Sequence, residues 1–278
     1  MKRLTLLFAV TASALLAVGG TIAVGSAAAT STLPTLSLTV TKSSITVGGA
    51  TQSGGVNVVS TATGVKEANV ILFLLKPGAT FDEVEAAIQK AHGDINVTSK
   101  YGSLVFDAEV SPGQSSEVQT YLQPGQYVAL LPGEGKGSKA HAIFTVTAAA
   151  SPVALPTPQA TISSIEFGFR GPSTLHDGEL VRFENEGFLV HMDIAAPVKN
   201  MKAAKQAVKD LFTGKEKAVG KLIIGPPAGF AGPLSHEAFQ QETITAKPGI
   251  YVEVCFMDTQ DGRQHTLLGM ERIIRIVK

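Results

Sequence analysis

The chain has 278 residues, a formal net charge of zero and charged residues at only 17% of positions. Such a balance argues against a partner or substrate of strong charge and against nucleic acid in particular. About 250 residues would remain after removal of an N-terminal leader, which suits two ordinary domains better than one large domain.

The N-terminus has the pattern of a secretory signal peptide. Lys2 and Arg3 precede an apolar run, and small residues ending at Ala29 follow it. Residues 1–29 are therefore predicted to be a signal peptide, which makes the protein secreted, periplasmic or attached to the cell surface. The apolar run from residue 4 to residue 24 is long enough for an uncleaved anchor, so attachment to the membrane surface is the alternative.

Residues 30–147 are predicted to form a first, mainly β domain. Segments such as NVILFLL, QYVALL and AIFTVTA are rich in Val, Ile and aromatic residues and are bounded by turn residues, as strands usually are. One helix is expected in TFDEVEAAIQKAH, where Thr80 and Glu83 form a capping box. The triplet Asn96-Val97-Thr98 matches a glycosylation sequon.

Residues 148–162 are predicted to be a linker because Pro and small residues cluster there without hydrophobic periodicity. Residues 163–278 again have the pattern of strands with one helical insert. In NMKAAKQAVKDLFTG, Asn200 is the expected cap and Gly214 the expected end. The fold class is therefore mainly β, with two sandwich domains in tandem, each carrying a short helix.

The two predicted domains resemble each other in spacing. Gly55 and Gly64 lie nine residues apart, and so do Gly178 and Gly187. Further along, LQPGQYVALL matches AKPGIYVEVC, and the offset between the copies grows by only one residue. We interpret the chain as a divergent internal duplication.

The segment 199–221 is rich in lysine, with seven lysines against Asp210 and Glu216. Lys202, Lys205 and Lys209 share one face of the expected helix. Such a face can steer an acidic redox partner or hold the protein near an anionic lipid or polymer. The alternative is an ordinary solvated helix face.

Cys255 is the only cysteine, so no disulfide accounts for it. A lone thiol in an oxidising compartment is either buried and inert or bound to something. His265 follows ten residues later and Met270 five residues after that. A thiolate with imidazoles and a thioether favours copper, and two histidines, one cysteine and a distant methionine make a blue-copper electron-transfer site. His191 is the candidate for the second histidine.

The residues around these candidates resemble the motifs of the cupredoxin, or blue (type 1) copper, family, which includes the plastocyanin- and azurin-like proteins. The matching positions are Phe183, Asn185, Gly187 and His191, then Pro248-Gly249, Tyr251 and Cys255, then His265, Gly269 and Met270. The resemblance implies two Greek-key cupredoxin-like domains and one type 1 copper bound by His191, Cys255, His265 and, weakly, Met270. It makes the first domain a degenerate copy, since Leu131 stands at the cysteine position and Ala68 at the position of His191.

Nine residues separate Cys255 from His265, a longer interval than small blue-copper proteins have and more similar to copper nitrite reductases. Asp261-Gly262 near its far end predicts that the loop forms a small hairpin before it returns to the site. Multicopper oxidases and nitrite reductases reach a second copper centre through a histidine next to the cysteine. Here the neighbours are Val254 and Phe256, and the sequence holds no His-x-His pair, so an enzyme is not expected.

Two hypotheses follow. The first is an exported copper-binding protein, a one-electron carrier or an envelope copper-binding protein with an unknown redox partner. The second is a metal-free β-sandwich that acts as an extracellular interaction or structural module, in which the Cys255 sulfur lies well away from both histidines. His141 supports the second, because it repeats the position of His265 in the copy without the other ligands. Ligand atoms within about 4 Å of one another would favour the first.

Overall fold

The computed structural model describes residues 32–65, 68–113, 115–132 and 140–278. The predicted signal peptide, residues 1–29, lies outside these ranges. Within them the chain is mainly β, with few and short helices, as predicted. No helix in the described part of the chain is both long enough and apolar enough to cross a membrane.

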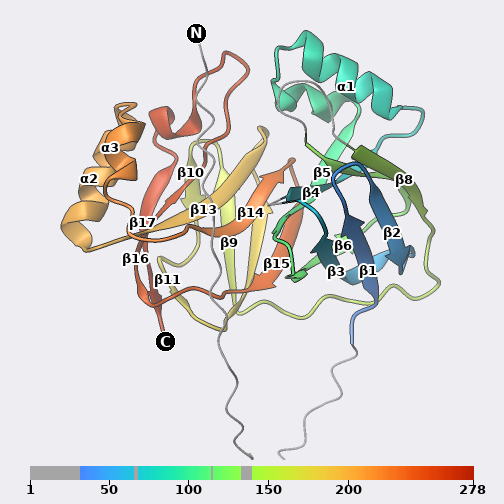
Figure 1. Cartoon of the computed structure of the whole chain (residues 1–278), viewed down its shortest axis with the longest axis horizontal. Helices are drawn as coiled ribbons and strands as arrows, with labels where there is room; N and C mark the ends of the chain where they lie inside the picture. Colours follow the sequence, from blue (N-terminus) through green and yellow to red (C-terminus); the bar gives the residue numbers. More distant parts are fainter. Residues whose placement is uncertain (1–31, 66–67, 114, 133–139) are drawn as a thin grey trace, which may run out of the picture.

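The strands up to residue 146 form the N-terminal sandwich, on the right in Figure 1. One layer runs in the order β6-β3-β1-β2, and the other runs β5-β4-β7-β8. Its strands are β1 (Thr35–Val40), β2 (Ile45–Gly49), β3 (Gly54–Ala62), β4 (Ala68–Leu75), β5 (Gly102–Val110), β6 (Ser115–Leu122), β7 (Gly125–Leu131) and β8 (Ala140–Val146). The helix α1 (Phe81–Lys90) and the 3-10 helix η1 (Ile95–Lys100) connect β4 to β5.

The strands from residue 160 form the C-terminal sandwich, on the left in Figure 1. One layer runs β10-β9-β12-β15, and the other runs β11-β17-β16-β13-β14. Its strands are β9 (Ala160–Ile165), β10 (Gly168–Arg170), β11 (Thr174–His176), β12 (Leu180–Asn185), β13 (His191–Val198), β14 (Ala228–Leu234), β15 (Phe239–Thr243), β16 (Gly249–Val254) and β17 (Glu271–Val277). Between β13 and β14 lie α2 (Met201–Phe212) and α3 (Glu216–Gly220), and η2 (His265–Leu268) precedes β17.

The two sandwiches share one sheet. β6 pairs with β15 at Gln119 and Gln241, which joins a layer of each sandwich into a continuous eight-stranded sheet. The Gln241 side chain is fully buried and donates to the Gln119 amide oxygen at 2.9 Å and to the Pro156 carbonyl at 3.0 Å. The pairing removes an exposed edge from each sandwich, so the two halves are joined by a shared sheet and not only by the connecting segment.

The segment expected to be a linker is packed against the fold. Gly55 donates its backbone N–H to the Val153 carbonyl at 2.7 Å, and the Ala149 N–H donates to the Ser53 hydroxyl at 3.0 Å. β9 begins at Ala160, inside the stretch 148–162. Pro and small residues here provide an extended segment that lies along a sheet, which composition alone does not distinguish from a free linker.

The recurring Pro-Gly-x-Tyr motif has a structural explanation. The Tyr127 hydroxyl donates to the Gln123 carbonyl at 3.1 Å, and the Tyr251 hydroxyl donates to the Lys247 carbonyl at 2.7 Å. Each tyrosine thereby fastens the turn that begins its own strand, β7 or β16. The motif therefore places the strand that leads to Leu131 in one half and to Cys255 in the other.

Local sequence accounts for both predicted helices. The Thr80–Glu83 capping box is present at the start of α1, and the Asn200 side chain accepts from the Ala203 N–H at the start of α2. α2 buries Ala204, Ala207 and Leu211. It packs against β16, β17 and η2, which sets this helix beside the segments that carry the candidate ligands.

Candidate metal centre

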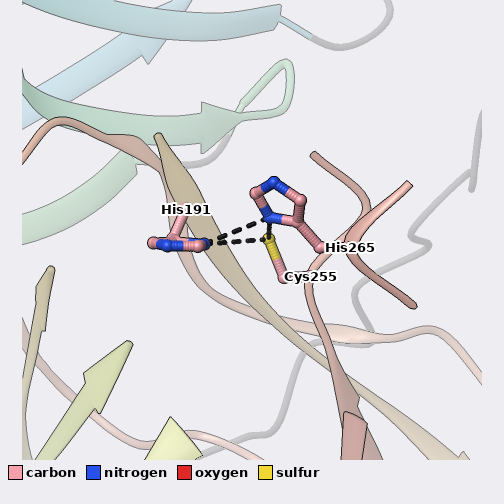
Figure 2. Close-up of side chains that lie close together, drawn as sticks. All are labelled: His191, Cys255 and His265. Carbon is pink, nitrogen blue, oxygen red and sulfur yellow. Dashed lines mark hydrogen bonds between the residues drawn. The ribbon is translucent and has the colours of Figure 1, made fainter. Parts of the chain in front are cut away.

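His191, Cys255 and His265 converge at one end of the five-stranded sheet, as Figure 2 shows. The Nδ1 atoms of the two histidines are 3.1 Å apart. The Cys255 Sγ lies 3.8 Å from the Nδ1 of His191 and 3.3 Å from that of His265. All three side chains are buried, with at most 1% exposed. Three residues that are distant in sequence thus present one ligand atom each to a common point.

Strand pairing brings His191 and Cys255 together. β13 and β16 are antiparallel neighbours with Ile194 opposite Val254, so the start of β13 lies beside the end of β16. Cys255 follows β16 directly, and its Sγ accepts a hydrogen bond from the Met192 N–H at 3.4 Å. Backbone geometry therefore fixes the sulfur next to the strand that begins with His191.

The long loop from Cys255 to His265 folds back as predicted. Asp258 and Gln264 form an antiparallel bridge, and the Thr259 N–H donates to the Arg263 carbonyl at 2.9 Å across the hairpin tip. The His265 N–H then donates to the Met257 carbonyl at 2.8 Å. The nine residues thus form a closed hairpin that returns His265 to the thiol.

A tight turn precedes His191. The Asn185 side chain accepts from the Gly187 N–H at 2.8 Å and donates to the Leu189 carbonyl at 2.7 Å and the Leu234 carbonyl at 2.8 Å. A Cβ at Gly187 would lie only 2.6 Å from the His191 Nε2. The Asn-x-Gly motif therefore holds the chain close against the imidazole.

Met270 lies beside the other three residues through its backbone. Its N–H donates to the His265 carbonyl at 3.0 Å, and its carbonyl accepts from the Cys255 N–H at 3.2 Å. The whole residue is buried. The structure thus brings the backbone of all four predicted ligands to one end of the sheet, and a role for the Met270 thioether belongs to the proposal below.

Burial keeps both imidazoles neutral. It lowers the pKa of His191 to about 3, and the nearby His265 adds a smaller electrostatic contribution. It also lowers the pKa of His265 to about 4, although the charge of Glu166 partly offsets this shift. A histidine must be neutral to bind a metal. Both side chains are therefore in the ligating form at neutral pH without first losing a proton.

Burial has the opposite effect on the thiol. It raises the pKa of Cys255 to about 12, partly offset by backbone hydrogen bonds from Met192 and Met257 and reinforced by Asp193 and Asp258. In the absence of a cation the sulfur thus stays protonated and unreactive at neutral pH. A metal that bound here would have to displace that proton.

The three side chains fit a soft, three-coordinate metal ion. The point equidistant from the two Nδ1 atoms and the Sγ lies about 2 Å from each, near the usual length of His and Cys bonds to such ions. Among the histidine, cysteine, aspartate and glutamate side chains of the described residues, these three lie close enough together to hold a metal ion. Two imidazoles and one thiolate suit copper, with zinc as the chemical competitor.

The N-terminal half holds no matching set at the corresponding positions. β4 begins with Ala68 where β13 begins with His191, and Leu131 ends β7 where Cys255 follows β16. His141 lies at the start of β8 with its ring 4.7 Å from that of Phe81. The contact with Phe81 therefore accounts for His141 without a metal.

Other residues that close the site were not predicted. Glu166 and Phe167 form the tip of the β9–β10 hairpin, where Phe167 has a positive φ of 60° and its ring meets that of His265 edge-on at 5.4 Å. Glu166 accepts the N–H groups of Phe188 and Leu189. Because these contacts join segments that are far apart in the sequence, no local sequence pattern predicts them.

No protein-family model matches the chain, and no curated protein matches it either. Among solved structures, it is similar to auracyanin from Roseiflexus castenholzii, with 18% identity, coverage of 42% of this chain and 95% of that one, and a TM-score of 0.26. It is also similar to auracyanin A, a "blue" copper protein of Chloroflexus aurantiacus, at 16% identity, 42% and 96% coverage and a TM-score of 0.24. The copper-containing nitrite reductase of Thermus scotoductus shows 13% identity, 88% and 68% coverage and a TM-score of 0.25. These TM-scores are low, whereas the site is defined by its own interatomic distances.

Proposed function

We propose that the protein binds one copper ion through His191, Cys255 and His265, with Met270 as a weak fourth ligand. The observation that carries this proposal is the set of three buried ligand atoms within 3.1 to 3.8 Å of one another. The metal-free hypothesis required the sulfur to lie well away from both histidines. Cys255 is buried, but its sulfur lies 3.3 Å from the Nδ1 of His265, so this requirement is not met.

Bound copper supplies one-electron chemistry, because it alternates between Cu(I) and Cu(II). The protein's own residues prepare the site for this. His191 and His265 offer neutral nitrogens, and Cys255 gives up its proton when a cation arrives. Met192 donates its backbone N–H to the sulfur at 3.4 Å, which stabilises the resulting negative charge. Because the surrounding chain buries all three side chains, water is kept away from them.

Electron carriage or copper holding at the cell envelope fits these residues better than an enzymatic reaction does. The neighbours of Cys255 in sequence are Val254 and Phe256, so no histidine there leads to a second metal. Multicopper oxidases and a nitrite reductase are among the similar solved structures. Because no histidine adjoins Cys255 in this chain, an oxidase or reductase activity would need a second metal from a partner.

The proposed redox partner is acidic. The seven lysines of residues 199–221 are all exposed, whereas Asp210 is buried and Glu216 is half-buried. Gly214, which follows α2, lies against Leu267 of η2, the 3-10 helix that begins with His265. The lysine-rich segment thus packs beside the 3-10 helix that carries His265. Export, with or without an uncleaved anchor, remains a proposal from the N-terminal sequence, and N-terminal sequencing of the mature protein tests it.

Titration of the purified protein with Cu(II) tests the proposal. We expect intense blue or green absorption from thiolate-to-copper charge transfer that saturates at one copper per chain. Cys255→Ser should abolish it, whereas His141→Gln, which alters a histidine outside the site, should leave it unchanged. Zn(II) should compete without producing colour. A wild-type protein that stays colourless at saturating Cu(II) would rule out the type 1 site.

A further inference from the structure

We propose that Asn96, in η1 of the N-terminal sandwich, is a positioning residue for the metal site. The side chain is 8% exposed. Its Oδ1 accepts the Val190 N–H at 2.8 Å, and its Nδ2 donates to the Asp258 carbonyl at 2.9 Å. The assignment of a metal to that site rests on the proposed function, whereas the two hydrogen bonds do not.

The two bonds fall on the two segments that carry the ligands. Val190 directly precedes His191, and Asp258 lies at the base of the hairpin that connects Cys255 to His265. One amide group thus links the residue before the first histidine to the hairpin that leads from Cys255 to the second. It does so from a sandwich that has no matching ligands of its own.

The amide is itself held in place. Asp94 caps η1 and accepts both the Asn96 backbone N–H at 2.9 Å and an Nδ2 hydrogen at 2.8 Å. All the hydrogen-bonding groups of the side chain are therefore engaged, and the orientation of the amide is determined. Because the side chain is buried and fully bonded, the Asn96-Val97-Thr98 sequon is not available for glycosylation in the folded chain.

Apolar packing supports the same alignment. Val190 is buried in a cluster whose other members come from the N-terminal sandwich, including Phe73, Phe81 and Val84, and Met257 packs against that cluster. Both residues flank candidate ligands. The N-terminal sandwich thus packs against each ligand-bearing segment, and Asn96 adds two hydrogen bonds to that packing.

Only an amide of this length satisfies both bonds. Asn96→Ala leaves the Val190 N–H and the Asp258 carbonyl without their partner. Asn96→Asp keeps the shape and can still accept from Val190, but it cannot donate to Asp258 and places a carboxylate beside Asp94. Thr120→Val is the matched control, because the Thr120 hydroxyl donates to the Phe239 carbonyl at 2.9 Å across the same sandwich interface without touching either ligand-bearing segment.

The first measurement needs no metal. We expect the Cys255 thiol of metal-free Asn96→Ala to react with a disulfide reagent about tenfold faster than that of the wild type, since each 1.4 kcal/mol of lost restraint gives a factor of ten. Hydrogen exchange should quicken at residues 190 and 257–265. Asn96→Asp should behave similarly even if Asn96→Ala folds poorly, and Thr120→Val should stay within about twofold of the wild type.

The second measurement uses Cu(II). The charge-transfer band and the reduction potential should shift in both Asn96 variants and stay unchanged in Thr120→Val. Colourless wild-type protein would refute the proposed copper site while the thiol and exchange data still test Asn96. Asn96 variants that match Thr120→Val in thiol reactivity and in exchange would overturn the positioning role.

Discussion

The protonation states of three buried side chains determine how the site should respond to pH. The pKa values of His191 and His265 lie at about 3 and 4, and that of Cys255 lies at about 12. Between pH 5 and pH 8 the pH is at least about one unit above the pKa of either imidazole and well below that of the thiol. In this window the imidazoles stay neutral and the thiol stays protonated. Metal binding in this window therefore exchanges one proton for the ion.

We predict that the apparent affinity for copper rises about tenfold per pH unit between pH 5 and pH 8, because one thiol proton is released per ion bound. Equilibrium titrations against a competing chelator, corrected for the chelator's own protonation, measure this slope. An affinity that does not change with pH would mean that the thiolate already exists without metal, contrary to the burial of Cys255.

Gly187 is predicted to be essential for the approach of the chain to His191. A Cβ there would lie 2.6 Å from the His191 Nε2 and 2.8 Å from the Glu166 Oε1. Gly187→Ala should therefore displace the imidazole and weaken copper binding by about tenfold or more. Gly229→Ala is the control, since a Cβ at Gly229 would meet no atom within 4 Å. Equal copper affinities for the two variants would show that the turn adjusts without moving His191.

Asp107 carries a pH-dependent cost unrelated to the metal. Burial raises its pKa to about 7, and the hydrogen bond from Asn69 only partly offsets this. The raised pKa means that the folded state resists ionisation, so stability is full below about pH 4 and is lost as the pH rises through about 7.

Asp107→Asn should remove this cost. We predict that urea unfolding of the metal-free protein gives equal stabilities for variant and wild type near pH 4 and a variant more stable by up to about 4 kcal/mol at pH 8. Glu117→Gln alters an exposed carboxyl on β6 and serves as the control. Parallel pH profiles for Asp107→Asn and the wild type would contradict the prediction.

At the scale of elements, the lysine face of α2 is predicted to discriminate between redox reagents by charge. Lys202, Lys205 and Lys209 are exposed, and α2 packs against η2. The copper protein should react faster with the anionic hexacyanoferrate than with a cationic cobalt complex of similar driving force. Changing the three lysines to Glu should reverse this preference by about tenfold at low salt, and added salt should remove it.

The control for that prediction changes three exposed lysines of the N-terminal sandwich, Lys42, Lys90 and Lys100, to Glu. Both triple variants carry the same net charge. If they alter the two rates equally, the effect comes from overall charge and α2 is not a docking face.

Sequence patterns predicted the elements whose causes are local. The capping box at Thr80, the cap at Asn200 and the hairpin around Asp261-Gly262 depend on neighbours within a few residues. The clustering of His191, Cys255 and His265 was inferred from motif spacing, and the structure brings these residues together. Whether they bind copper stays a prediction.

Long-range contacts outside the ligand motifs could not be predicted from the sequence. Asn96 matched a glycosylation sequon, yet its amide bonds Val190 and Asp258, which lie 94 and 162 residues away. Met201 lies at helical spacing from the apolar residues Ala204 and Val208, yet it is 38% exposed, whereas Ala207 is buried. A period of 3.6 residues gives the direction of a helix face but not which edge of it a neighbouring sheet covers.

At the scale of the whole molecule, the eight-stranded sheet makes the two sandwiches one folding unit. β6 and β15 pair within a single sheet, and a packed segment rather than a free linker connects the halves. The N-terminal sandwich also packs against both ligand-bearing segments. If one half unfolded alone, the other would be left with an exposed sheet edge and an exposed apolar face. The free-energy cost of that exposure favours unfolding of both halves together.

We therefore predict that the chain unfolds in one transition and that copper, although bound in the C-terminal sandwich, stabilises both halves. A ligand at 100 times its dissociation constant adds about 2.7 kcal/mol to a two-state unit. Calorimetry should show a single peak that moves upward with copper, and hydrogen exchange should slow in β1 and β3 as well as in β13 and β16. Residues 160–278 produced alone should bind copper without the absorption and potential of the full chain. Two calorimetric peaks, of which copper moves only one, would mean that the shared sheet does not couple the sandwiches and that the site is complete in the C-terminal half.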